Sequence, residues 1–512
     1  MIKKFTREEF SKSLFNCHNT IRDNDKLSPE AAFDEISKIL FIKIRKERDC
    51  IKGIYSKKVY GREKTKYNLT NKTLTDYYQH LFNLVKEHYA NEGLFEPYER
   101  IRIRENSFEQ IIEELESFNL SKFSDDIKGI AFEEFLGTTF RGELGQFFTP
   151  RTVVDFMVSI LDPQENELIC DPCCGSGGFL IKAYQYVREK IEKSKKYFEN
   201  EKKQLIQQVA SRHLFGTDAN PRMARTAKMN MIMHGDGHSG IYHHDGLLNV
   251  CDIFEERFHV ILTNPPFGSH VSKSLLITEE DLLKDETLIA KYKDQFGERF
   301  EVSMQQISKN LQKPLLNLYQ TGKMSGLTEV LFIERCLNLL VPGGRLGIVL
   351  PEGVMDGNKL HKVREFIESK SRILCIVSLP QEVFVKSGAS IKPSILFLKK
   401  FTVDEQAAYD KTTSDAEKML EEKYASEWSQ LKNEKSEAST TEEIVIVRQK
   451  ERILKQKIEA EKLKEIKKQL NYSVPVAKVN TAGIGTRGEA VDNELPSLSK
   501  EFKKYRLKAS LW

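Results

Sequence analysis

Long apolar runs are missing from this sequence of 512 residues, and none reaches the length needed to span a membrane. The first ten residues, MIKKFTREEF, also lack the apolar core of a secretory signal peptide. Cysteine is scarce: eight are scattered along the chain, which excludes a disulfide framework and is typical of a protein in a reducing compartment. We therefore expect a cytoplasmic protein with no membrane partner.

Two phosphate-binding signatures are absent as well. No segment has the GxxxxGK(S/T) pattern of a nucleotide-hydrolysing loop, so we expect no motor driven by nucleoside triphosphates within this chain. The glycine-rich turn with Gly175, Gly177 and Gly178 does not have the GxGxxG spacing of a dinucleotide site, which disfavours NAD as a ligand.

Clusters of metal ligands are missing too. Cys170 and Cys173 form a Cys-x-x-Cys pair, but no second pair lies nearby to complete the four ligands of a structural zinc. Four histidines lie close in sequence without the helix-face spacing of a ligand pair, and we expect them at the surface: His234, His238, His243 and His244. We therefore expect no metal ion.

The charge is nearly balanced, with 79 Lys and Arg against 75 Asp and Glu, for a formal net charge of +4. This excess is too small to indicate a polyanionic partner, so any affinity for DNA has to come from local patches or from another subunit. One patch lies between Gly53 and Asn71, where a predicted loop has five Lys and Arg interleaved with three Tyr. The pattern fits a contact with a phosphate backbone and a solvated loop equally well.

The rest of the chain is organised around the stretch Phe258–Gly268, FHVILTNPPFG. Val260–Leu262 is a short apolar run rich in β-branched residues, which predicts a buried strand of a parallel sheet. Prolines cannot donate to a strand ladder, so the Pro-Pro pair forces the chain off the sheet at its carboxyl edge, where open α/β sheets bind ligands. Asn264 and Phe267 then present an amide and a phenyl ring, which suits a planar ring with an exocyclic amine.

Three acidic residues follow other predicted strands. The apolar run Leu168–Cys170 leads into Asp171, a glycine-rich turn and the predicted helix Phe179–Lys193. Glycines allow the backbone to approach a ligand closely, and a helix N-terminus favours an anionic group. Asp218 is positioned to accept ribose hydroxyls, and Asp245 to accept a hydrogen bond from an adenine amino group. Each acid alone also fits a solvated strand end, but their order between the glycine turn and the Pro-Pro pair favours ligand contacts.

Three motifs follow one another along the chain: GQFFTP at residues 145–150, DPCCGSGGF at 171–179 and NPPF at 264–267. In this order they resemble the N6-adenine DNA methyltransferase family, in particular the modification subunits of type I restriction-modification systems. The resemblance is strong over residues 125–400 and weaker outside them. It implies an α/β fold, a Rossmann-like methyltransferase sheet with a terminal antiparallel hairpin. It also implies transfer of a methyl group from S-adenosylmethionine to adenine N6 in DNA.

The resemblance also implies which residues form the site. The catalytic loop is Asn264, Pro265, Pro266 and Phe267. Within the cofactor site, Asp171 would face the ammonium group and the glycine backbone the carboxylate. The cofactor residues are Gln146, Phe147, Phe148, Thr149, Asp171, Gly175, Ser176, Gly177, Gly178, Phe179, Asp218 and Asp245.

Composition and periodicity divide the chain into four parts. We expect a helical N-terminal domain at residues 1–124, the methyltransferase domain at 125–403, a charged helical hairpin at 404–470 and a C-terminal segment at 471–512. Within the methyltransferase domain, the long polar segment 269–327 is expected to cover the mouth of the active site. The hairpin has no Pro or Gly, and its apolar stripe is too thin for a core of its own. We expect its two helices to be separated by a break near Ser436–Thr441.

No sizeable segment looks like a base-reading module, which would need its own helix, ribbon or loop set in a DNA groove. The resemblance therefore implies a separate specificity subunit flanked by two copies of this chain, acting on double-stranded DNA with a flipped adenine. A restriction or motor subunit is a further partner that such a system allows. We expect the hairpin 404–470 to help dock the specificity subunit; a solvated spacer is the alternative.

Other functions stay open at this point. One is methyl transfer to a protein glutamine, although such enzymes usually have tyrosine where this chain has Phe267. Another is a non-catalytic scaffold of a restriction or defence complex, against which the intact Asn264 and glycine turn argue. Enzymes that methylate cytosine N4 tend to have serine at the position of Asn264.

Overall fold

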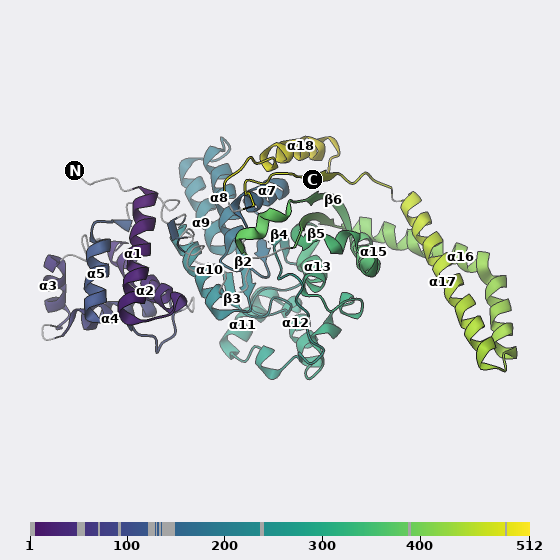
Figure 1. Ribbon diagram of the computed structural model, residues 1–512, viewed down its shortest axis with the longest axis horizontal. Coiled ribbons are helices and arrows are strands. Elements are labelled where there is room, and N and C mark those ends of the chain that lie inside the picture. The colour runs from purple at the N-terminus through teal and green to yellow at the C-terminus, as the bar shows by residue number, and fades with distance from the viewer. Residues whose placement is uncertain are drawn as a thin grey trace.

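The computed structural model describes residues 6–48, 57–69, 72–90, 94–120, 129, 131–132, 135, 149–235, 240–387, 391–469, 471–486 and 489–512. Figure 1 shows three parts along the long axis of the molecule: a group of N-terminal helices, a central sheet covered by helices, and a two-helix hairpin that projects at the opposite end. No helix among the described residues is both long and apolar enough to cross a membrane.

The N-terminal part is helical, as predicted. Helix α1 begins after Thr6, whose hydroxyl accepts from the N–H of Glu9, while the Glu9 carboxylate accepts from the N–H of Thr6. The apolar faces of these helices close on a shared core that includes Phe33, Leu81 and Phe108. The helices are α1 (Arg7–Asp25), α2 (Pro29–Arg48), α3 (Lys57–Lys66), α4 (Leu74–His88) and α5 (Glu105–Glu116).

The basic stretch between residues 53 and 71 is not simply a loop, because α3 occupies Lys57–Lys66. Lys, Arg and Glu are good helix formers, so a stretch dense in them favours a helix wherever one side can pack. Tyr60 and Tyr67 supply that side, since both rings pack against the core of the N-terminal helices. A contact of this stretch with DNA stays a prediction.

The central sheet has eight strands in the order β3-β2-β1-β4-β5-β7-β6-β8. Strand β7 runs antiparallel to β5 and β6, while the strands from β3 to β5 are parallel. This confirms the predicted sheet with a terminal antiparallel hairpin. The strand order reverses between β1 and β4, where open α/β sheets bind their ligands. The strands are β1 (Ile169–Asp171), β2 (Leu214–Asp218), β3 (Gly240–His243), β4 (Phe258–Thr263), β5 (Leu340–Pro351), β6 (Ser371–Ser378), β7 (Pro393–Lys400) and β8 (Val476–Lys478).

Helices cover both faces of the sheet. Along β4, Val260 and Leu262 face one core and Ile261 faces the other, as the alternation of a strand requires. Helices α7, α8 and α10 supply the first core, and α13 and α15 supply the second. The helices of this part are α7 (Arg151–Leu161), α8 (Gly178–Lys193), α9 (Glu199–Arg212), α10 (Pro221–Met233), α11 (Glu286–Phe296), α12 (Glu298–Lys309), α13 (Thr328–Leu339), α14 (Glu352–Asp356) and α15 (His361–Lys370), with short 3-10 helices η2 (Glu279–Asp281), η3 (Leu315–Leu318), η4 (Thr321–Lys323), η5 (Asn358–Leu360) and η6 (Gln381–Ser387).

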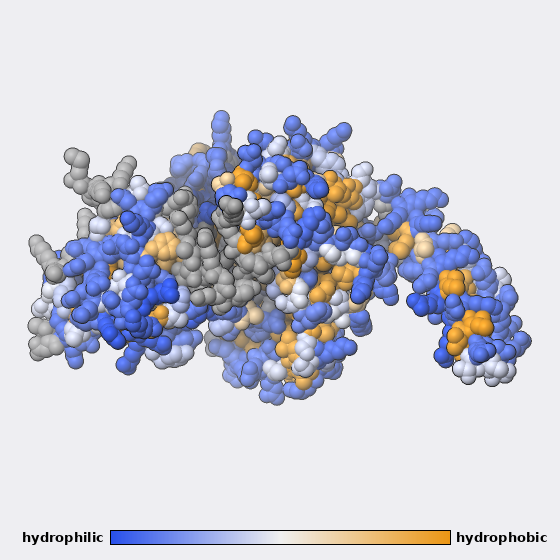
Figure 2. Space-filling model, in the orientation of Figure 1, coloured by the Kyte–Doolittle hydropathy of each residue, from blue (hydrophilic) through white to orange (hydrophobic). Residues whose placement is uncertain are grey.

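The charged region forms a hairpin of α16 (Val403–Glu437) and α17 (Thr441–Gln469), with its break where the sequence predicted one. A small apolar cluster that includes Leu420, Tyr424 and Leu454 joins the two helices. Ion pairs add to it, among them Lys450–Glu434 at 2.8 Å. Exposed apolar residues remain on the hairpin and include Val445, Ile446 and Ile453. Figure 2 shows apolar patches, in orange, on the surface of the hairpin.

The C-terminal segment returns to the central sheet. Strand β8 pairs in parallel with β6, with Val476 opposite Ile376. Helix α18 (Leu495–Lys508) packs beside α7, and Arg506 forms an ion pair with Asp162 at 3.0 Å. This segment therefore shares the core of the sheet domain.

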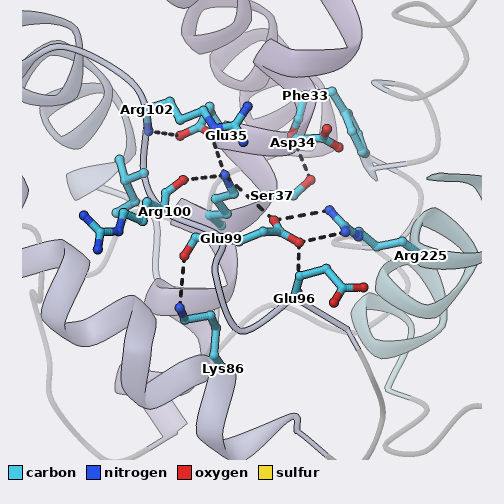
Figure 3. Close-up of polar contacts among 12 residues, drawn as sticks. Phe33, Asp34, Glu35, Ser37, Lys86, Glu96, Glu99, Arg100, Arg102 and Arg225 are labelled. Carbon is cyan, nitrogen blue, oxygen red and sulfur yellow. Dashed lines mark hydrogen bonds and ion pairs between the residues drawn. The ribbon is translucent and has the colours of Figure 1, made fainter. Parts of the chain in front are cut away.

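An ion-pair network joins the N-terminal helices to α10 (Figure 3). Arg225 of α10 lies 2.7 Å from the carboxylate of Glu99, and Lys38 lies 3.9 Å from the same carboxylate and 2.6 Å from that of Glu35. Removing one partner would leave a buried charge unpaired, so the network favours one placement of the N-terminal helices on α10. The same helix contributes apolar side chains to the N-terminal core: Met229, Ile232 and Met233.

Candidate active site

The Asn-Pro-Pro-Phe segment leaves the sheet directly after β4, as predicted. Thr263, the last residue of β4, is buried and donates its hydroxyl to Oδ1 of Asp171 at 2.7 Å. The Asn264 side chain donates from Nδ2 to Oγ1 of Thr149 at 2.9 Å, while its Oδ1 has no hydrogen-bond partner among the described residues. The amide is therefore held by its nitrogen and leaves an acceptor oxygen unused.

Thr149 directly precedes α7 but does not cap it. The order Thr149-Pro150 is a helix-start pattern that predicts Thr149 as the N-cap, whereas the N-cap of α7 is Pro150, with no side-chain cap hydrogen bond among the described residues. Thr149 instead contacts Asn264 and lines a small cavity beside it. The other predicted residues of its motif, Gln146, Phe147 and Phe148, lie outside the described residues.

Phe267 is 8% exposed and packs its ring against Phe384 of η6, with ring centres 6.0 Å apart at 85°. It belongs to the apolar core on the α7 face of the sheet and lines neither of the two cavities described below. A stacking contact between Phe267 and a base stays a prediction.

The glycine-rich turn lies between β1 and α8. Gly175 and Gly177 have φ angles of 52° and 82°, which L-residues with a side chain rarely adopt, and α8 begins at Gly178. Asp171 at the end of β1 is buried, and its Oδ1 also accepts from the N–H of Cys173 at 3.2 Å. Burial raises the pKa of Asp171 to about 7, against the lowering effect of the hydrogen bonds from Thr263 and Cys173.

Asp218 joins two turns. Its carboxylate accepts from the N–H of Gly175 at 3.0 Å and from the N–H of Asn220 at 2.8 Å. Burial raises the pKa of Asp218, and these two N–H groups partly offset the rise. Asp218 is thus held at the carboxyl end of β2, beside the glycine-rich turn.

Asp245 follows β3, and its Oδ1 accepts from the N–H of Leu247 at 2.9 Å. Burial also raises the pKa of Asp245. The next residue, Gly246, packs so tightly on the turn after β1 that an added Cβ would lie 1.9 Å from the Pro172 carbonyl oxygen. Gly246 therefore allows Asp245 to lie next to the glycine-rich turn.

Two adjoining cavities open at this edge of the sheet, one of about 560 Å³ and one of about 70 Å³. Cys173, Gly175 and Asn264 line both. Gly177 lines neither. The predicted residues that line at least one cavity are Thr149, Asp171, Gly175, Ser176, Gly178, Phe179, Asp218, Asp245, Asn264, Pro265 and Pro266.

Three further residues belong to the site and were not predicted as site residues, although the sequence drew attention to Cys173 as half of a Cys-x-x-Cys pair. Cys173 lines both cavities, and its Sγ lies 2.8 Å from the Thr263 hydroxyl. Asn220 caps α10 at the larger cavity by accepting from the N–H groups of Arg222 and Met223. Gly246 is the third. The pair Asn220-Pro221 is a helix-start pattern that predicts this cap, whereas nothing in the sequence indicates the tight packing of Gly246.

The four histidines are not all at the surface. His234 is buried, and its Nδ1 lies 2.9 Å from the Asn230 carbonyl oxygen, so the expectation of a surface position was wrong for this residue. It caps the end of α10 where that helix packs on the N-terminal core. His243 is exposed, His244 is half-buried and His238 lies outside the described residues. Within the described ranges, no group of three or more His, Cys, Asp or Glu side chains is arranged to hold a metal ion.

The sheet order, the glycine-rich turn after β1, the acids after β2 and β3, and the Asn-Pro-Pro-Phe segment after β4 define a methyltransferase of Rossmann-like fold. A model of the N-6 DNA Methylase family matches residues 123–314 and 317–482, and the chain belongs to this family. The family resemblance inferred from the three motifs is thus confirmed.

Individual relatives agree with the family. The chain is 29% identical over 295 residues to the type I restriction enzyme EcoEI methylase subunit of Escherichia coli, a match that covers 57% of this chain and 50% of that protein. It is 25% identical over 266 residues to the EcoKI methylase subunit of Escherichia coli strain K12, covering 51% of this chain and 41% of that protein. The chain thus spans half or less of the length of these curated relatives.

A solved structure shares the fold. A modification subunit of a putative type I restriction enzyme from Vibrio vulnificus superposes with a TM-score of 0.52 and 18% sequence identity. The superposition covers 77% of this chain and 82% of that one. The shared architecture therefore extends beyond the sheet to most of both chains.

Proposed function

We propose that this protein transfers a methyl group from S-adenosylmethionine to N6 of adenine in DNA, as the modification subunit of a type I restriction-modification complex. The observation that supports this best is the Asn264 amide. Its nitrogen donates a hydrogen bond to Thr149, its oxygen is buried with no hydrogen-bond partner among the described residues, and the residue lines both cavities. An acceptor held in this way suits an amine donor such as the exocyclic N6 of adenine.

The residues around the cavities fit S-adenosylmethionine. The N-terminus of α8 borders the smaller cavity, and the N–H groups of a helix N-terminus favour a carboxylate. Asp171 in the same wall suits the ammonium group, and Asp218 in the larger cavity suits the ribose hydroxyls. Asp245 would accept from the adenine amino group of the cofactor. Bound there, the cofactor supplies an electrophilic methyl group on a sulfonium sulfur.

The task left to the chain is to activate a weak nucleophile, because the lone pair of the adenine amine is delocalised into the ring. We assign Asn264 Oδ1 and the Pro265 carbonyl oxygen as acceptors of the two amino hydrogens. Both bonds strengthen as positive charge develops on the nitrogen, so they stabilise the transition state more than the ground state. The base has to leave the duplex to reach these acceptors, and Phe267 is proposed to stack on it.

We further propose that a separate specificity subunit chooses the DNA sequence, with two copies of this chain beside it. The hairpin α16–α17 offers a docking surface. Ile446 and Ile453 lie seven residues apart on α17 and are 53% and 57% exposed. Residues seven apart share one side of a helix, which is the spacing of a seam between helices. A restriction or motor subunit is a further partner that such a complex allows.

A methylation assay tests this proposal. The purified chain is incubated with DNA and radiolabelled S-adenosylmethionine, alone and with the specificity partner that copurifies from the native host. We expect label in DNA, and N6-methyladenine at one recurrent sequence, only when the partner is present. Label in protein would favour the glutamine alternative, and cofactor binding without transfer in the complex would favour a scaffold. A recurrent methylated sequence with the chain alone would refute the need for a partner.

A further inference from the structure

Helix α13 buries three charged side chains next to the active-site cavity. Glu329, Glu334 and Arg335 are 2%, 6% and 1% exposed. Burying a charge is unfavourable unless hydrogen bonds compensate it, so each of these side chains has to have partners. In each case the partners include backbone groups of a loop distant in sequence.

The partner of Glu329 lies directly after the Asn-Pro-Pro-Phe segment. Both carboxylate oxygens of Glu329 are within hydrogen-bond distance of the N–H of Gly268, at 3.2 and 3.3 Å. The preceding residue, Thr328, donates from its N–H and from its hydroxyl to the Ser269 carbonyl oxygen, at 2.9 and 3.0 Å. The first turn of α13 therefore holds the two residues that follow Phe267 by hydrogen bonds.

These hydrogen bonds act on a stiff segment. Two consecutive prolines have their φ angles restricted by their rings, so the chain from Asn264 to Phe267 bends little within itself. Its orientation then depends on its two ends. At the N-terminal end of the segment, Thr263 is hydrogen-bonded to Asp171, and at its C-terminal end Gly268 is hydrogen-bonded to Glu329. Loosening one end would tilt the whole segment, with the Asn264 oxygen and the Pro265 carbonyl on it.

We infer that Glu329 is a positioning residue for methyl transfer, which it serves by holding Gly268 and thereby the two acceptor oxygens. This inference rests on the proposed function. Glu329 lines neither cavity, so it acts through the backbone of the loop and not by touching the base or the cofactor. Misplacing a reacting group by about 1 Å can cost a factor of about one hundred in rate. The contact therefore matters for the rate of transfer and not for cofactor binding.

The same helix offers a matched control. Glu334 is also a buried carboxylate of α13, and it accepts from the N–H groups of Gln320 and Thr321 at 3.0 and 2.7 Å. Neither Gln320 nor Thr321 lines a cavity described above. Glu334 also accepts from the Thr321 hydroxyl at 2.7 Å. Replacing Glu334 therefore removes more hydrogen bonds than replacing Glu329, which makes it a stringent control, and it does not touch the Asn-Pro-Pro-Phe segment.

The experiment compares Glu329→Ala, Glu329→Gln and Glu334→Ala with the wild type. We measure kcat and KM for methyl transfer by the complex with the specificity partner, cofactor affinity by calorimetry, and hydrogen exchange at the Gly268 amide in the full chain. For Glu329→Ala we expect kcat to fall about tenfold to a hundredfold, Gly268 to exchange faster and cofactor affinity to stay unchanged. Glu329→Gln keeps an acceptor oxygen of the same reach and should recover most of kcat. Glu334→Ala should lower thermal stability and leave kcat near the wild-type value.

Several results would overturn the inference. Equal losses of kcat in Glu329→Ala and Glu334→Ala would point to general damage to α13, and a loss of cofactor affinity as large as the loss of kcat would place Glu329 in the cofactor site. If the Glu329→Ala variant does not fold, the Glu329→Gln variant decides. A folded but inactive Glu329→Gln variant counts against the inference. An active wild type with an equally active Glu329→Ala variant refutes the inference alone. A wild-type complex that does not methylate DNA refutes the proposed function, and the inference with it.

Discussion

Replacing Asn264 with alanine separates the effect on catalysis from the effect on stability, because the oxygen and the nitrogen of this amide have different surroundings. Within the part of the chain that the structure describes, the side chain forms one hydrogen bond, from Nδ2 to Thr149, and its loss should destabilise the protein by about 0.5–1.5 kcal/mol. Among the described residues, the Oδ1 has no hydrogen-bond partner to lose. It should instead contribute in the transition state, where removing one such partner costs about two to three powers of ten in rate, or about 2.7–4 kcal/mol.

The assay measures methyl transfer to DNA by the complex, together with cofactor affinity by calorimetry and thermal unfolding. We expect Asn264→Ala to lose most of the rate, with cofactor affinity nearly intact and only a small drop in stability. Thr149→Val is the matched control, because it removes the same hydrogen bond but keeps the acceptor oxygen, and should lower the rate much less. A loss of cofactor affinity as large as the loss of rate would show that Asn264 is structural and would refute the reasoning.

Three other predictions follow from the same site and from the hairpin. Asp218→Ala should weaken S-adenosylmethionine binding by about 1–3 kcal/mol, because ligand hydroxyls would lose their acceptor, and unchanged calorimetric affinity would return Asp218 to a purely structural role. Cofactor affinity should fall about tenfold per pH unit below pH 7, because burial raises the pKa of Asp171 to about 7 and only the ionised carboxylate pairs with an ammonium group. Calorimetry from about pH 5.5 to about pH 8.5, a range that brackets this pKa, measures the change in cofactor affinity. The Asp171→Asn variant should bind the cofactor weakly and with no such dependence on pH. Replacing both Ile446 and Ile453 with Glu should release the specificity partner in size-exclusion chromatography, because charges cannot pack in an apolar seam between helices. Cofactor affinity should stay intact. An unchanged complex would favour the alternative that the hairpin is a solvated spacer.

Several elements of the fold could be predicted because their causes are local. Val260–Leu262 is apolar and is followed by two prolines, so both the strand and its end are dictated by neighbouring residues. The charged hairpin was equally visible in composition, including the break between its helices. Strand β8 was not visible, because three residues contain no periodic pattern and their pairing with β6 depends on a strand about a hundred positions earlier.

The sequence by itself determined which chemical groups stand at the ends of the strands: an amide after β4, carboxylates on the last residues of β1 and β2, and a carboxylate shortly after β3. It did so because strand, turn and helix signals act over a few residues, and parallel strands bring their carboxyl ends to one edge. Only the tertiary structure decided how those groups are held. The bond from Asn264 to Thr149 and the bond from Gly268 to Glu329 join residues 115 and 61 positions apart. A hydrogen bond depends on distances of a few ångströms between such residues, which the folded chain defines and residue order does not.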